Sequence, residues 1–205
     1  MIDRLTKNEF AWFPERGVGF YPVTCFPYDA DYFNKYKGYA ETELGKKITQ
    51  ARVAFVDKYF VGNLLDVGIG CGQFVLSRSN TFGYDVNPVA VQWLQDQGLY
   101  YGLYWNEQFE AVTFWDSLEH IERPEDAIKQ AKKYVFVSIP IFTGLDDILN
   151  SRHYRKDEHY WYFTHSGLVD WFSSNGFDLK EREDFESKLG RDSVLTYAFK
   201  RRTND

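Results

Sequence analysis

The sequence lacks any hydrophobic run long enough to cross a membrane. A spanning helix needs about 20 consecutive apolar residues, whereas polar and charged side chains interrupt every apolar stretch of this 205-residue chain. The segment from Met1 to Phe10 mixes charges with apolar side chains and does not resemble a secretory signal. These absences exclude a helical membrane protein and predict a soluble protein that is not exported.

Cysteine is also scarce, since the only two, Cys25 and Cys71, lie far apart and form no C-x-x-C pair. Neither a disulfide framework nor a cysteine-based zinc site is therefore expected. This usage is typical of a reducing compartment, and we expect a cytoplasmic protein.

Basic residues are in deficit, with 24 Lys and Arg against 30 Asp and Glu and a formal net charge of -6. No run of Lys or Arg is long enough to form the basic stripe that binds nucleic acid. The charge pattern therefore argues against a nucleic-acid partner.

Aromatic residues, by contrast, are abundant: 18 Phe, 15 Tyr and 6 Trp make up 19% of the chain. Most of them are expected to fill the core, but their excess also indicates a ring-lined pocket or lid. Residues 1–37 combine aromatics with Gly and Pro and show no steady period, so we expect an irregular arm there. A second polar and aromatic stretch, residues 141–163, interrupts the regular pattern further on.

Between these stretches, strand-like and helix-like segments alternate. An amphipathic helix is predicted over residues 39–60, because apolar side chains recur there every three or four residues. The predicted strands that follow are 64–67, 81–84, 99–104, 110–115, 134–140, 177–182 and 193–199. Strands that alternate with helices predict an α/β fold whose doubly wound, mostly parallel sheet carries helices on both faces. The last two strands have no predicted helix between them and should form an antiparallel C-terminal hairpin.

A glycine-rich loop follows the first of these strands. In such sheets ligands bind beyond the carboxyl ends of the strands, and glycines at 68, 70 and 72 let a ligand approach the backbone closely. Gln73 stands where a dinucleotide-binding loop has its last glycine, so a diphosphate ligand is less well matched. Asp85 ends the next predicted strand, where a carboxylate can accept both hydroxyls of a ribose. These residues therefore match a ligand that contains adenosine but no diphosphate better than a dinucleotide.

Four segments resemble the motifs of class I S-adenosylmethionine-dependent methyltransferases of the small-molecule branch. They are Leu65–Gly72 (LDVGIGCG), Gly83–Asn87 (GYDVN), Phe114–Ile121 (FWDSLEHI) and the stretch from His159 to Phe177. The resemblance implies a Rossmann-like fold and S-adenosylmethionine as cofactor. We expect residues 1–205 to form one domain, with an N-terminal arm and helix at 1–62 and the cofactor-binding core at 63–205.

The resemblance also implies roles for individual residues. Asp66 and the glycine loop would hold the methionine part of the cofactor, Asp85 the ribose and Val86 the adenine, while Trp115 and Asp116 would border the transferable methyl. The remaining cofactor-binding residues of this set are Gly68, Ile69, Gly70, Cys71, Gly72 and Gln73. A carboxylate and an aromatic face both suit a cationic sulfonium. A capping role for Asp66 and core packing for Trp115 are the alternatives.

Methyl transfer is an in-line displacement that needs alignment and exclusion of water but no covalent nucleophile. For a hydroxyl or amine acceptor, His120 is the candidate general base, with Glu119 beside it. His159, Tyr160 and Trp161 are predicted to bind the acceptor, a small or sugar-like molecule. A capping or packing role is the alternative for each histidine.

Asp116, Glu119 and His120 also have a spacing that can bring three ligands to one divalent ion. Adjacent side chains point in different directions on a regular helix, however, so we predict no metal. Two other functions stay open: a non-catalytic, cofactor-binding partner subunit, and a nucleic-acid or protein methyltransferase. The sequence does not indicate the oligomeric state.

Overall fold

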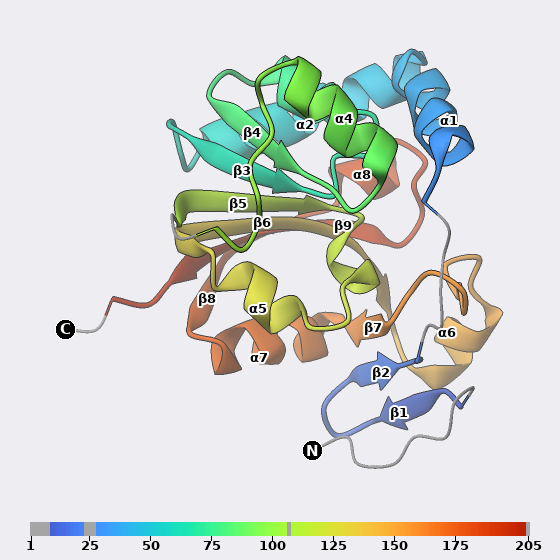
Figure 1. Ribbon diagram of the computed structural model, residues 1–205. Coiled ribbons are helices and arrows are strands. Elements are labelled where there is room, and N and C mark those ends of the chain that lie inside the picture. Colours follow the sequence, from blue (N-terminus) through green and yellow to red (C-terminus); the bar gives the residue numbers. More distant parts are fainter. Residues whose placement is uncertain (1–8, 23–27, 106–107, 204–205) are drawn as a thin grey trace.

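A nine-stranded sheet organises the part of the chain that the structure, a computed structural model, describes: residues 9–22, 28–105 and 108–203 (Figure 1). The strands are β1 (Ala11–Phe13), β2 (Val18–Phe20), β3 (Leu64–Val67), β4 (Thr81–Tyr84), β5 (Phe109–Trp115), β6 (Ala131–Phe142), β7 (Trp161–Thr164), β8 (Phe177–Glu183) and β9 (Val194–Arg201). The helices are α1 (Ala30–Ala40), α2 (Glu43–Asp57), α3 (Gln73–Ser77), α4 (Pro88–Asp96), the 3-10 helix η1 (Leu118–His120), α5 (Pro124–Ile128), α6 (Leu145–Asn150), α7 (His165–Ser174) and α8 (Phe185–Lys188). None of the helices in these ranges is long and apolar enough to cross a bilayer.

The centre of the sheet is parallel and doubly wound, as the sequence predicts. Strands β4, β3, β5 and β6 lie side by side in that order and run parallel. The chain passes from β3 to β4 on one side and then crosses to β5 on the other, so the strand order reverses at β3. Strand β9 runs antiparallel to both β6 and β8, which confirms the C-terminal hairpin.

Helices cover both faces of the sheet (Figure 1). Helices α5 and α7 pack on one face, where the rings of Phe172 and Phe199 stack with centroids 3.8 Å apart. Helices α2 and α3 pack on the other face, where Phe55 and Phe74 contribute to a second core cluster. Parallel strands buried on both faces are expected to be uniformly apolar, and β3 is buried along its whole length.

The N-terminal segment is more regular than expected. Strands β1 and β2 form an antiparallel hairpin, and β2 pairs with β7, so the hairpin extends the sheet beyond β6. Residues 30–40 form helix α1, which begins at the side chain of Asp29. The prediction of an irregular arm was therefore wrong within the described residues, because three-residue strands are too short to show alternation and depend on their pairing with β7. Residues 1–8 and 23–27, with Cys25 among them, lie outside the described residues.

Two further expectations need correction. Residues 99–104 form no strand and contribute a single bridge between Tyr100 and Gly83. The short helix α8 lies between β8 and β9, where none was predicted. Four residues are too few to show a helical period, and the structural role of α8 comes from one buried acid, Glu186.

Glu186 belongs to a buried ion network that ties α2, the end of β5 and α8 together. Arg52 of α2 donates to Glu186 Oε1 at 2.7 Å and to Asp116 Oδ2 at 2.8 Å. Arg191 binds both oxygens of Asp116 at 2.8 Å and also contacts Glu186. The Ser138 hydroxyl donates to Glu186 at 2.6 Å. Two cations and two anions thus balance, which is what allows Glu186 to be fully buried.

We expect Glu186→Ala to lower the free energy of unfolding by about 3–5 kcal/mol, because it removes a fully buried carboxylate and leaves two partly buried arginines to share the carboxylate of Asp116. Urea denaturation checks this value. The matched control is Asp184→Ala, which removes the exposed partner of Lys188 and should cost less than about 1 kcal/mol. Equal losses in the two variants would contradict a special role for the network.

Candidate active site

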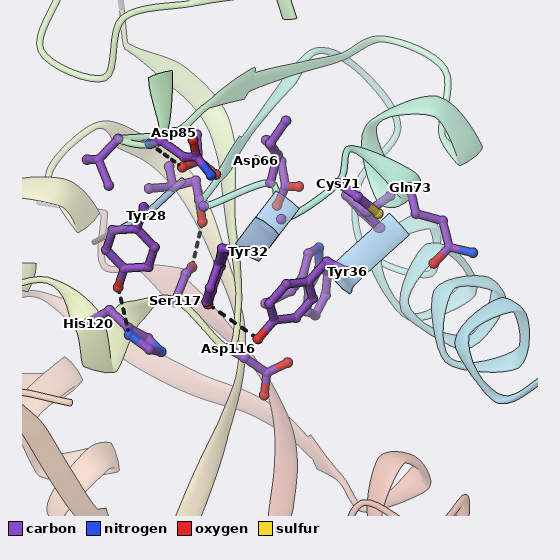
Figure 2. A pocket seen from close by; sticks show the side chains of 18 of the residues that line it. Tyr28, Tyr32, Tyr36, Asp66, Cys71, Gln73, Asp85, Asp116, Ser117 and His120 are labelled. Carbon is purple, nitrogen blue, oxygen red and sulfur yellow. Dashed lines mark hydrogen bonds between the residues drawn. The ribbon is translucent and has the colours of Figure 1, made fainter. Parts of the chain in front are cut away.

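A pocket of about 570 Å³ opens at the carboxyl ends of β3, β4 and β5, where the strand order reverses. Its floor is the glycine loop after β3, and α1 and the residues before it form the opposite wall (Figure 2). The position agrees with the rule for open parallel sheets. Most of the residues that the sequence assigns to the cofactor line it, namely Asp66, Gly68, Ile69, Gly70, Cys71, Gln73, Asp85, Val86, Trp115 and Asp116.

The glycines of the loop have two different reasons to be glycine. All three have positive φ, at 78°, 57° and 82° for Gly68, Gly70 and Gly72. A Cβ on Gly68 would lie 2.5 Å from the Cβ of Ser117, and one on Gly72 would overlap Trp93. A Cβ on Gly70 would meet only Tyr36, at 3.8 Å across the pocket. Gly68 and Gly72 thus serve close packing, whereas Gly70 leaves space for a ligand.

Two carboxylates flank this loop, of which Asp66 is buried and Asp85 is partly buried. Asp66 Oδ1 accepts a hydrogen bond from the Thr113 hydroxyl at 2.7 Å, and Asp85 Oδ1 accepts one from the backbone N–H of Asn87 at 2.8 Å. Burial raises the pKa of Asp66 to about 7 and that of Asp85 to about 6, because desolvation outweighs these hydrogen bonds. A ligand with a cationic group or with hydroxyl donors would stabilise both carboxylates.

Asp116 differs from Asp66 and Asp85 because it forms ion pairs with two arginines. Burial alone would raise the pKa of Asp116, but Arg191 and Arg52 hold it below its usual range. Its backbone is left-handed, with φ at 55°, which turns the chain sharply at the end of β5. The Trp115 ring is buried between the Arg52 guanidinium, 5.0 Å from the ring centroid, and the ring of Phe74. Trp115 therefore combines the predicted place in the pocket wall with core packing.

His120 faces the far end of the pocket and meets a tyrosine there. Its Nδ1 lies 3.1 Å from the hydroxyl of Tyr28 (Figure 2). Burial lowers the pKa of His120 to about 4, against the opposing effect of the Glu158 and Asp116 carboxylates. The imidazole is thus neutral at pH 7 and has a lone pair for a hydroxyl in the pocket.

Four of the predicted residues do not line the pocket. Gly72 packs under Trp93, and Glu119 and His159 are buried. The Trp161 indole donates to the carbonyls of Ile121 and Glu122 instead. Tyr160 does line the pocket. Gln73 reaches it too, but its amide accepts from Thr49 and donates to the carbonyl of Ala40, so it joins α3 to α2 and α1.

Sequence reasoning expected a ring-lined pocket or lid but named none of its tyrosines, and it missed the two arginines. Tyr28, Tyr32 and Tyr36 all line the pocket, and the hydroxyl of Tyr32 donates to that of Tyr36 at 3.3 Å. The i, i+4 spacing of Tyr32 and Tyr36 after a capping Asp29 was a usable signal of a one-sided helix. Arg52 and Arg191 gave no local signal, because their partners are distant in sequence.

Comparison with known families shows which kind of domain contains this pocket. Residues 36–181 match a family model described as a methyltransferase domain. The chain belongs to this methyltransferase family. No curated protein has a sequence that matches the chain.

Solved structures share the fold at low sequence identity. Magnesium protoporphyrin IX methyltransferase from Synechocystis PCC 6803, with bound S-adenosylhomocysteine, has 13% identity and a TM-score of 0.58 over 84% of this chain and 95% of that one. An S-adenosylmethionine-dependent methyltransferase from Thermotoga maritima has 16% identity and a TM-score of 0.60 over 84% and 97%. The [4+2]-cyclase SpnF has 17% identity and a TM-score of 0.57 over 78% and 82%. Identities this low show the shared fold alone.

The protein is thus a methyltransferase, and it has the Rossmann-like fold of these structures. The pocket fits S-adenosylmethionine, the cofactor that the sequence motifs imply, in two respects. Its floor at Gly70 is open where a side chain would fill it, and Asp66 and Asp85 have raised pKa values that a cationic, hydroxyl-bearing ligand would lower.

The affinity for S-adenosylhomocysteine should depend on pH through Asp66. The carboxylate protonates below about pH 7 without ligand, whereas the ammonium group of the ligand would keep it ionised. Affinity should therefore be constant above pH 7 and should fall as pH drops below 7, by up to about tenfold per pH unit. Calorimetry from pH 8 to pH 5.5 measures this slope.

In Asp66→Asn the affinity at pH 8 should be lower and the slope between pH 7.5 and pH 6.5 should disappear. Asp126→Asn, on the surface at α5, is the matched control and should keep the slope of the unmodified chain. An unchanged slope in Asp66→Asn would show that another group controls binding.

Proposed function

We propose that this methyltransferase transfers the methyl group to a hydroxyl or amine of a small-molecule acceptor bound beside His120. The observation that carries the proposal is the contact between His120 Nδ1 and the Tyr28 hydroxyl, inside the pocket that also holds Asp66, Asp85 and the glycine loop. A hydroxyl in the pocket already occupies the position that the acceptor's hydroxyl would take. The acceptor heteroatom and its base would then lie in the same cavity as the cofactor.

The cofactor would lie along the loop, with its ribose at Asp85 and its amino group at Asp66. S-adenosylmethionine supplies a methyl group activated by a cationic sulfur. Gly70 leaves room for the ligand, and Val86, exposed at the rim, offers an apolar surface for the adenine. Trp115 and Asp116 border the sulfur end, where the Arg52 and Arg191 partners of Asp116 keep it ionised.

His120 would accept the acceptor's proton, since burial keeps its imidazole neutral at pH 7. Its low pKa makes it a weak base, so most of the rate would come from alignment and exclusion of water. Glu119 is buried and does not line the pocket, so we assign it no direct contact with the acceptor.

The tyrosines of α1 would cover the acceptor and exclude water. The Tyr32 ring lies between those of Tyr28 and Tyr36, at centroid distances of 5.1 Å and 4.8 Å. Such a wall suits a small, flat or sugar-like acceptor that binds by ring contact and hydroxyl hydrogen bonds. Because α1 supplies this wall and α2 supplies Arg52, residues 1–62 would act in one domain with the core.

The test is transfer of a labelled methyl group by the purified chain to panels of phenols, sugars, amines and carboxylates. Product with a hydroxyl or amine acceptor supports the proposal, whereas product with carboxylates alone contradicts it. In His120→Asn, kcat should fall at least about 100-fold while affinity for S-adenosylhomocysteine stays within about threefold. Cofactor binding without transfer to any class would favour the non-catalytic partner subunit.

The tyrosine wall gives a separate prediction. Tyr32→Ala should lower kcat/KM for the acceptor at least about 30-fold, equivalent to about 2 kcal/mol, with cofactor affinity changed less than about threefold. Tyr154→Ala is the control, since Tyr154 packs against Phe10 and Tyr162 away from the pocket. Loss of cofactor affinity together with activity would place Tyr32 in the cofactor site instead.

A further inference from the structure

Glu119, His120 and His159 form a cluster beside the pocket. One potential ligand atom from each of the three side chains lies within 4.8 Å of the other two. Glu119 and His159 are almost fully buried, whereas His120 is partly exposed and lines the pocket. The rings of His120 and His159 meet edge to face, with centroids 4.6 Å apart.

Local backbone geometry explains why neighbouring side chains converge here. Glu119 and His120 lie in the 3-10 helix η1, not on a regular α-helix, so the argument from α-helical directions does not hold. His159 is brought to them by the backbone: the Tyr160 amide donates to the Glu119 carbonyl at 2.9 Å. Asp116, which the spacing also suggested as a ligand, is bound by Arg52 and Arg191 instead.

The cluster contains a buried acid that lacks a counter-charge. Glu119 Oε2 is buried and has no hydrogen-bond partner among the described residues. The nearby arginines are occupied, since Arg191 binds Asp116 and Glu186, and Arg155 donates to Glu158 at 2.7 Å. An unpaired buried carboxylate costs several kcal/mol unless a cation or a proton neutralises it. The side chains beside it are the imidazoles of His120 and His159, the side-chain type that most often binds metal ions.

We propose that Glu119, His120 and His159 bind a divalent transition-metal ion of the Zn²⁺, Fe²⁺ and Co²⁺ class. Two imidazoles and one carboxylate are the protein ligands of open zinc and non-haem iron sites. Imidazole nitrogens favour these ions over Mg²⁺ and Ca²⁺, which prefer oxygen ligands. The Tyr28 hydroxyl forms a hydrogen bond with Nδ1 of His120. A hydrogen bond to the second ring nitrogen commonly orients a histidine that binds a metal ion.

The inference goes beyond the proposed function and does not rest on it. If the ion binds Nε2 of His120, the imidazole hydrogen lies on Nδ1, which then cannot accept a proton from the acceptor. An acceptor hydroxyl that coordinates the ion would instead have its pKa lowered by the ion. In the metal-bound protein His120 is therefore a ligand and not the general base.

The experiment titrates the tag-free chain, freed of metal with a chelator, with Zn²⁺ by calorimetry and with Co²⁺ by visible absorption. We expect one ion per chain with a dissociation constant of about 10 µM or lower and a Co²⁺ band typical of nitrogen and oxygen ligands, with Mg²⁺ at least about 100-fold weaker. Glu119→Gln and His159→Gln should each weaken Zn²⁺ binding at least about tenfold. His153→Gln is the matched control, since His153 lies in the same segment but contacts the Asp192 carbonyl, and it should bind as the unmodified chain does.

Absence of binding, equal affinity in all variants, or preference for Mg²⁺ would each overturn the proposal. Circular dichroism in chelator checks that each variant folds, and His120→Asn replaces either variant that does not. S-adenosylhomocysteine is titrated into the same preparations. Cofactor binding without metal binding refutes the metal site alone, whereas metal binding without cofactor binding or methyl transfer refutes the proposed function alone.

Discussion

The balance of buried charge at the carboxyl end of β5 is the constraint on which the rest of the site depends. Glu186 can be buried, and Asp116 partly buried, only because Arg52 and Arg191 neutralise them. These contacts fix α2 and α8 against the end of β5, and α2 in turn presents the arginine that covers Trp115. One wall of the pocket is therefore held by ion pairs between segments that are distant in sequence.

The acids of the site fall into two groups, according to whether an arginine neutralises them. Asp116 and Glu186 have arginine partners and are complete within the protein. Asp66 and Asp85 accept hydrogen bonds but have raised pKa values, and Glu119 has a buried oxygen without a partner among the described residues. In this second group a cationic or hydroxyl-bearing ligand would change the electrostatic energy most, because no cation within the protein neutralises these acids.

The fold is shared with proteins whose chemistry differs, including a porphyrin methyltransferase and a [4+2]-cyclase. Three further segments are attached to the central parallel strands. The β1–β2 hairpin pairs with β7 (Figure 1). Helix α1 supplies tyrosines to the pocket wall, and the segment before β7 brings His159 to η1. If the glycine loop and the end of β4 bind the cofactor, as proposed, acceptor selection would reside in α1 and in the segment before β7.

The sequence by itself determined the features that depend on local pattern. The glycine loop that follows the first parallel strand and the acid at the end of β4 are each contained in a few consecutive residues, and the structure has them where they were predicted. Short local signals sufficed because glycine conformation, capping and strand hydrophobicity are properties of neighbouring residues.

Only the tertiary structure decided which side chains meet across the fold. It paired Asp116 with Arg52 and Arg191. It also brought His159 to Glu119 and His120. A third such contact is the hydrogen bond between the Tyr28 hydroxyl and the His120 imidazole. No local pattern encodes these contacts, because each joins residues from separate elements. Their geometry depends on the register of β5, β6 and β7 and on a 3-10 turn too short to show a period.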